Sequence, residues 1–366
     1  MAKANQYHPQ SVSHPGTTLS EKLTELGMGP KEFAVRTGKP EKTITAILKG
    51  DSALTPDMAV LFENVLHIPA RFWLQRQLQY DEAVARAKAA EQIKQAESWA
   101  KAFPVVKMIR LGWLPVVSSA TERTAAMLNF FGVSTAAAWS DYYLNTRLKN
   151  SFRISLAHAK DPHAISAWLR RGELQASELQ ATPYSESAFR NVLTQIKRLT
   201  AEHPVNFFEQ LQTVCLTAGV KVVHTPCLPK APISGATRWV GNHPLIQLSC
   251  RYKRNDIFWF TVFHEAGHIL LHGKKDIFLE AAEFGDQYKQ QEQEADDFAV
   301  QWTLNKAQEQ QIVNTSPLTV EGVHEYAKTF GTHPAIIIGR LIRLGILHTS
   351  VGYQYGFFEK VELDIP

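Results

Sequence analysis

The sequence predicts a mainly α protein (α+β) of several domains, with one small antiparallel sheet in its C-terminal half. Three observations lead to this fold class. The chain has 366 residues, which is more than one ordinary hydrophobic core accommodates. Its amphipathic segments recur at the period of an α-helix and are separated by Gly and Pro. Only the pieces "VKVVHT", "GATRWVG" and "PLIQLS" are short and β-branched or alternating, as strands are.

Composition restricts the class of protein and its setting. Hydrophobic residues make up 45% and charged residues 20%, as in an ordinary soluble globular protein. The start, "MAKANQYHPQ", lacks the apolar core of a secretory signal, and the most apolar run carries His and Glu, so we expect no membrane span. The three cysteines fit neither a disulfide framework nor a metal clip, which favours buried free thiols and a cytoplasmic location. The net charge of +4 permits nucleic-acid binding without indicating it.

Residues 1–79 read as a bundle of short helices. "TTLSEKLTELG" places leucines at i, i+4 and i+7, and "TPDMAVLFENVL" has Thr55 as N-cap and Pro56 at the first helical position. Between them, "PKEFAVRTG" and "PEKTITAILKG" form two short helices joined at "TGK", which is typical of a helix-turn-helix. The pattern alone leaves a helical bundle without DNA-binding function as the alternative.

The stretch from "HPGTTLSEKL" to "FWLQRQLQYDE" resembles the DNA-binding antidote proteins of the HigA type over some seventy residues. The resemblance implies that the helix near Pro40 enters the major groove of an operator. It further implies base-edge contacts from one group of residues and phosphate contacts from another. The first group is Glu41, Lys42 and Thr45, and the second is Lys39 and Lys49.

The central part of the chain is expected to be helical. Residues 80–103 are rich in Ala, Glu, Lys and Gln without Gly or Pro, which predicts a linker helix. Residues 104–205 contain helical segments with many aromatic residues, which we interpret as core. No catalytic pattern is visible in this middle region, and we assign it no function beyond spacing or partner binding.

The stretch "FHEAGHILLH" predicts a metal site in the C-terminal region, residues 206–366. His264 and His268 are four residues apart, so on a helix they share one face and can bind one tetrahedral zinc ion. Glu265 is rotated away from the metal and is placed to act as a general base on a water molecule. Small and apolar residues surround these polar side chains and are expected to exclude water from the site.

A catalytic zinc site requires a third protein ligand. His272 lies one turn beyond His268, but three successive histidines are awkward on one small ion. The segment "QEQEADDFAVQWTL" predicts a second helix whose Glu294 lies at the edge of the buried face, and we expect Glu294 to be the third ligand. Asp297 is expected to orient a ligand histidine. A solvated acid in an acidic run is the alternative interpretation of Glu294.

"WFTVFHEAGHILLHG" followed by "EQEADDFAVQWTL" resembles the ImmA/IrrE family of bacterial zinc metallopeptidases over roughly residues 206–347. The resemblance implies a zincin-like fold, Zn²⁺ bound by His264, His268 and Glu294, and Glu265 as catalytic base. The later "VEGVHEYAKTFGTHPAIIIGRLIRLGIL" resembles the closing helix pair of that family. We interpret this pair as scaffold, with a second DNA-binding element as the alternative.

Two hypotheses of function follow. In the first, the chain is an antitoxin-type transcriptional regulator that binds double-stranded operator DNA. Its fused zinc metallopeptidase cleaves a regulatory protein, or the chain itself. In the second, the zinc domain is not an enzyme and serves folding, sensing or the binding of a partner such as a toxin. Helix-turn-helix proteins usually pair to read two half-sites, which favours a homodimer over a monomer.

Overall fold

The computed structural model describes residues 12–146, 161–273, 278–279, 286–315 and 317–363. The chain forms two compact units, Met1–Gln95 and Ala96–Pro366. The predicted mainly α fold with one small sheet is confirmed. Within the described residues, no helix combines the length and the apolar character that crossing a membrane requires.

The first unit is a bundle of four short helices and one long one. They are α1 (Pro15–Glu25), α2 (Pro30–Thr37), α3 (Glu41–Lys49), α4 (Pro56–Leu66) and α5 (Ala70–Gln95). Their apolar faces meet in one core that includes Leu19, Phe33, Ile44 and Phe62. Of the predicted i, i+4, i+7 leucines of α1, Leu19 and Leu23 lie in this core. Leu26, at the C-terminal cap of α1, is 47% exposed and does not.

Local signals set the ends of these helices. The Thr55 hydroxyl accepts the backbone N–H of Met58 at the start of α4, as predicted for an N-cap. Gly38 follows the last residue of α2 and Gly50 follows the last residue of α3. Both glycines lie in the left-handed region, with φ of 65° and 79°, and so terminate these helices. The turn between α2 and α3 is consequently tight, as a helix-turn-helix requires.

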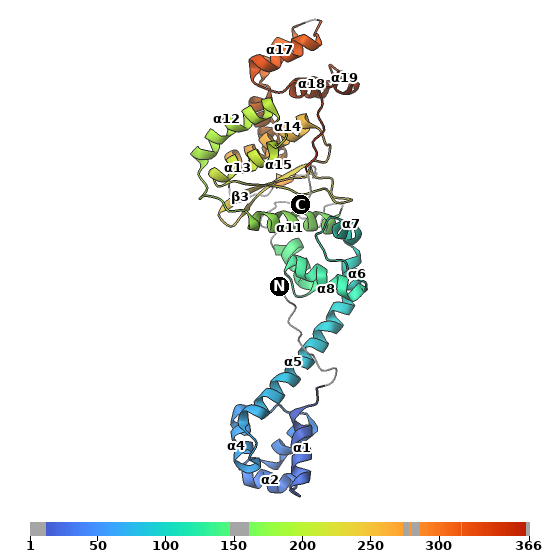
Figure 1. Ribbon diagram of the computed structural model, residues 1–366, viewed down its shortest axis with the longest axis vertical. Helices are drawn as coiled ribbons and strands as arrows, with labels where there is room; N and C mark the ends of the chain where they lie inside the picture. Colours follow the sequence, from blue (N-terminus) through green and yellow to red (C-terminus); the bar gives the residue numbers. More distant parts are fainter. Residues whose placement is uncertain (1–11, 147–160, 274–277, 280–285, 316, 364–366) are drawn as a thin grey trace. The chain divides into compact units, whose positions relative to one another are not determined.

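The second unit contains the remaining elements (Figure 1). Before the sheet lie α6 (Glu97–Lys101), α7 (Val105–Arg110), α8 (Ala120–Phe131), α9 (Ala136–Trp139), the π-helix η1 (Ser140–Thr146), α11 (Pro162–Glu178), α12 (Glu186–Glu202) and α13 (Phe207–Thr217). The strands are β1 (Lys221–His224), β2 (Gly235–Val240), β3 (His243–Leu248) and β4 (Phe278–Leu279). The C-terminal helices are α14 (Asn255–His272), α15 (Asp286–Thr303), α16 (Lys306–Val313), α17 (Val320–Phe330), α18 (Pro334–Arg343) and α19 (Ser350–Gln354).

The sheet is mixed, with the strand order β1-β3-β2-β4. Strand β2 is antiparallel to β3 and to β4, as expected, but β1 runs parallel to β3. The expectation of a purely antiparallel sheet is therefore wrong for β1. The connection from His224 to Gly235 is too long for a tight hairpin and carries three prolines, so β1 and β2 do not pair directly.

The two faces of the sheet contact different layers of helices. In Figure 1, α11 covers one face and α13, α14 and α15 lie on the other. Neighbouring residues of β1 point to opposite sides: Val222 joins the core around α14, whereas Val223 packs with Ala176 of α11. Helix α14, which carries the metal motif, is thus buried between the sheet and the C-terminal helices.

The middle helices pack on this sheet. The indole N–H of Trp168 donates to the Thr225 carbonyl at 2.8 Å, and the Gln247 amide donates to the Trp168 carbonyl at 2.7 Å. A Cβ at Gly172 would overlap the Gln247 side chain, so α11 approaches β3 at a distance that only glycine permits. The aromatic residues Trp139 and Trp168 are buried as predicted.

Candidate metal centre and recognition helix

The metal motif lies where α14 and α15 cross at short range. A Cβ at Gly267 would lie 3.2 Å from the Phe298 Cβ and 3.3 Å from the Ala295 Cα. Ala295 and Ala299 of α15 are fully buried. Small residues on both helices therefore bring the backbone of α15 close enough for its acidic side chains to reach the histidines of α14.

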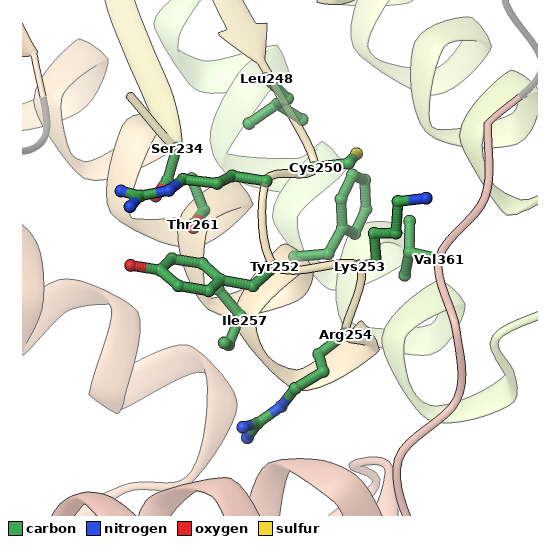
Figure 2. A pocket seen from close by; sticks show the side chains of 11 residues that line it. Ser234, Leu248, Cys250, Tyr252, Lys253, Arg254, Ile257, Thr261 and Val361 are labelled. Carbon is green, nitrogen blue, oxygen red and sulfur yellow. The ribbon is translucent and has the colours of Figure 1, made fainter. Parts of the chain in front are cut away.

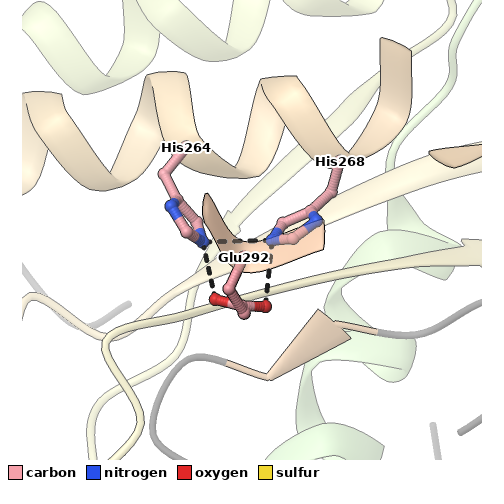
Figure 3. A group of neighbouring side chains, drawn as sticks. All are labelled: His264, His268 and Glu292. Atoms are coloured by element: carbon pink, nitrogen blue, oxygen red, sulfur yellow. Dashed lines mark hydrogen bonds and ion pairs between the residues drawn. The ribbon is translucent and has the colours of Figure 1, made fainter. Parts of the chain in front are cut away.

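Three side chains converge at this crossing (Figure 3). The Nε2 atoms of His264 and His268 lie 3.0 Å apart. Glu292 of α15 spans them, with one oxygen 3.3 Å from the Nε2 of His264 and the other 3.4 Å from the Nε2 of His268. His264 and His268 are 4% and 1% exposed, so the part of the cluster that α14 contributes is buried.

The donor set fits zinc. Zinc prefers imidazole nitrogen and carboxylate oxygen, and ligands at its usual bond lengths around a tetrahedral ion lie about 3.3–3.6 Å from one another. The separations of 3.0, 3.3 and 3.4 Å between the ligand atoms are close to that range. Among the described residues, the side chains placed to hold one metal ion together are those of His264, His268 and Glu292.

The charges of the cluster also favour a cation. Burial alone would lower the pKa of His264, but its hydrogen bonds to Asp296 and Glu292 outweigh burial and raise that pKa to about 10. Burial lowers the pKa of His268 to about 4, so this imidazole is neutral and able to ligate. Burial would raise the pKa of Glu292, yet its contacts to both histidines lower it to about 2. The carboxylates around His264 therefore stabilise positive charge at this cluster.

Two further contacts orient the histidine rings. The Nδ1 of His264 lies 3.0 Å from an oxygen of Asp296, whose other oxygen accepts from Arg343 of α18 at 2.7 Å. The Nδ1 of His268 lies 3.0 Å from the Nδ1 of His272. The Nε2 of His272 in turn lies 3.0 Å from an oxygen of Glu294. Each ligand histidine thus has a partner that fixes its ring, as metal-binding histidines usually do.

The structure brings Glu292, and not Glu294, to the two Nε2 atoms. The side chain of Glu294 is 45% exposed and contacts His272. Asp296 takes the orienting position expected of Asp297, which lies 3.9 Å from Lys306 instead. The helical period of the sequence could have identified Glu292. Position 292 lies three residues before Ala295 and seven before Ala299, so it shares their buried face. Position 294 is rotated by about 100° from Ala295.

Glu265 is fully buried beside the cluster. One of its carboxylate oxygens accepts the Thr237 hydroxyl at 2.6 Å, and the same hydroxyl lies 3.0 Å from its backbone carbonyl. A Cβ at Gly235 would overlap the Glu265 carboxylate, so β2 leaves room for this carboxylate only because position 235 is glycine. Strand β2 therefore holds the expected base close enough to His264 for its charge to help raise the pKa of that imidazole.

The start of α14 is fixed by the loop before it and by the C-terminal segment. The Arg254 guanidinium donates to Asp256 at 2.6 Å and lies 3.7 Å above the ring of Phe358. The backbone N–H of Asn255 donates to the Glu359 carbonyl. Figure 2 shows this loop around a recess of about 10 Å³, which is room for about one water molecule. The recess is therefore too small for a substrate.

The candidate recognition helix α3 has a different surface. Ile44 and Ile47 anchor it in the core of the first unit. Glu41, Lys42 and Lys49 are exposed, whereas Thr45 and Lys39 are half-buried. Among the described residues, none of the three lysines pairs with a carboxylate. Their charges are therefore available to an external partner.

Comparisons with known proteins agree with both halves of this description. The model of the IrrE N-terminal-like domain, a peptidase family, matches residues 215–341, which include His264, His268 and Glu292. An uncharacterized HTH-type transcriptional regulator of Escherichia coli, YddM, is 34% identical over 70 residues, which are 19% of this chain and 70% of that protein. The chain belongs to the HTH-type transcriptional regulators.

Solved structures similar to the regulator include an addiction module antidote protein of the HigA family from Coxiella burnetii. It is 31% identical and covers 24% of the regulator and 95% of its own chain, with a TM-score of 0.23. The antitoxin HigA of Pseudomonas aeruginosa, solved with the higBA promoter, is 28% identical over 23% of the regulator and 94% of its own chain, with a TM-score of 0.22.

Proposed function

We propose that the chain is an antitoxin-type transcriptional regulator whose C-terminal region is a zinc-dependent metallopeptidase that cleaves a regulatory protein or the chain itself. One observation carries the peptidase half of this proposal. A buried carboxylate, Glu265, lies beside two histidines and a second carboxylate, Glu292, whose ligand atoms are spaced as around one tetrahedral ion. Catalytic zinc sites use three protein ligands of this kind.

In the proposed reaction His264, His268 and Glu292 hold the ion. Zinc held by these residues would supply a Lewis acid for a peptide carbonyl and would make water more acidic. Glu265 takes up the proton of the attacking water and transfers it to the leaving amine. Thr237 donates to one oxygen of Glu265 at 2.6 Å, which keeps the carboxylate in a single orientation for this transfer.

The outer contacts position the ligand histidines. If His268 ligates through Nε2, its Nδ1 carries a proton and donates to the Nδ1 of His272. His272 then carries its own proton on Nε2 and donates to Glu294 at 3.0 Å. We therefore assign Glu294 to the support of His268, and Asp296 to the support of His264.

The first unit is proposed to bind double-stranded operator DNA through α3. Glu41, Lys42 and Thr45 would contact base edges, and Lys39 and Lys49 would contact phosphates. The exposure of Glu41, Lys42 and Lys49 and the tight turn before α3 support this assignment. A homodimer reading two half-sites is the proposed assembly.

In the alternative function the chain is a repressor or antitoxin without proteolytic activity. Its zinc domain then serves folding, sensing or the binding of a partner protein. A structural zinc site has no use for a base, so the placement of Glu265 favours the enzyme.

The test is the substitution Glu265→Gln, which retains the shape and hydrogen-bonding ability of the side chain but removes the base. A partner protein encoded by an adjacent gene is co-expressed, and its cleavage is followed on gels together with release of promoter repression. We expect Glu265→Gln to retain zinc and DNA binding and to lose proteolysis by about 10²–10⁴-fold.

The matched control is Glu321→Gln, which changes an exposed glutamate of α17 and should cleave like the parent. If the parent relieves repression and Glu265→Gln does so equally well, the metal domain acts by binding and the peptidase proposal is wrong.

A further inference from the structure

A second cavity lies in the middle helices, away from the metal centre. It has a volume of about 490 Å³ and is formed by α6, α7 and the start of α8, together with Pro229. This volume is within the range of about 300–1,000 Å³ that is usual for small-molecule sites. Its apolar part includes Phe103, which is buried, and Val105 and Val106.

Four cationic side chains surround this apolar part. Lys101 and Arg110 are exposed, and Lys107 and Arg123 are half-buried. Within the described residues none of the four forms an ion pair with a carboxylate. Like charges gathered around one cavity repel each other, so this arrangement costs stability unless an anion is bound.

The acidic residue of the lining, Glu97, offsets only one of these four charges. Its carboxylate accepts the Thr121 hydroxyl at 2.8 Å, which holds it at the start of α8. The cavity thus combines an apolar body with a positively charged border, which is complementary to a molecule with an apolar chain and an acidic head.

We propose that this cavity is a binding site for an amphiphilic small-molecule anion, such as a carboxylic acid or a phosphate ester with an apolar body. The apolar body packs against Phe103, Val105 and Val106, and the head accepts hydrogen bonds from Lys107 and Arg110. Pro229 of the lining lies six residues before Gly235, on the segment that leads into the strand that holds Glu265. The proposal does not depend on the metal centre or on proteolysis.

The experiment is isothermal titration calorimetry of the full chain with decanoate, decyl phosphate and the neutral decanol. We expect saturable binding of at least one of the two anions, at least about tenfold tighter than binding of decanol, because the head exchanges water for charge-assisted hydrogen bonds. The double variant Lys107→Gln, Arg110→Gln should weaken anion binding by at least about tenfold.

Lys88→Gln, which changes an exposed lysine of α5 outside the lining, is the matched control and should bind like the parent. Thermal unfolding of each variant shows that it is folded, and Val106→Trp, which fills an exposed part of the cavity, gives an independent block. Three results would overturn the proposal: binding of neither anion, binding of decanol as tight as that of the anions, or anion binding by the double variant equal to that of Lys88→Gln.

Discussion

Helices α3 and α14 both carry the polar residues that we propose for function, but they present them in opposite ways. Helix α3 buries two isoleucines and leaves Glu41 and Lys42 in solvent. Helix α14 buries His264, Glu265 and His268 within an apolar core. An external partner would have access to the side chains of α3, whereas the polar side chains of α14 contact partners within the fold.

The difference determines what each helix reveals. Buried polar groups must be hydrogen-bonded or bind a cation. Each of the three buried polar side chains of α14 accordingly has a neighbour within hydrogen-bond distance: Asp296 for His264, Thr237 for Glu265 and His272 for His268. Exposed side chains have no such requirement. The fold therefore specifies the roles on α14 closely, and on α3 it specifies only which residues are accessible.

The largest expected effect is on the metal. His264→Ala or His268→Ala removes one of three ligands from a buried site, so neither variant should retain stoichiometric zinc. Elemental analysis of the purified proteins measures this directly. Full zinc content in both variants would mean that the buried cluster is not the metal site.

A smaller effect is expected from the outer contact of His268. His272→Ala should lower zinc affinity by about 10–100-fold, the usual effect of removing a residue that orients a metal ligand. Competition with a chelating dye gives the affinity. His272→Gln, which can still hydrogen-bond to His268, should recover part of the loss, and an unchanged affinity in His272→Ala would contradict the positioning role.

The sequence was sufficient for the features that depend on local spacing. His264 and His268 meet because four residues are about one helical turn, and α4 begins at its predicted cap, Thr55. The identity of the third ligand depends on the rotation of α15 about its axis, which the packing of Ala295 and Ala299 against α14 sets. Glu294 lies at the edge of the predicted buried face, whereas Glu292 lies on the side of the two alanines. The parallel pairing of β1 depends on a long-range contact that no local pattern contains.

The smallest effects are expected on α3. Lys42→Ala should change which bases are preferred, whereas Lys49→Ala should weaken binding to all sequences alike and lower the salt slope by about one unit. Gel shifts on the chain's own promoter at several salt concentrations separate the two outcomes. No shift by the intact protein at low salt would contradict the proposal of a DNA-binding regulator.

The zinc content of Glu292→Gln compared with Glu294→Gln tests the central claim most directly. The two substitutions are chemically identical and lie two residues apart on one helix. Glu292 contacts His264 and His268, whereas Glu294 contacts His272. We predict that Glu292→Gln loses stoichiometric zinc, while Glu294→Gln retains it with an affinity reduced by about 10–100-fold. Loss of zinc in Glu294→Gln with full zinc in Glu292→Gln would contradict the assignment of Glu292 as the third ligand.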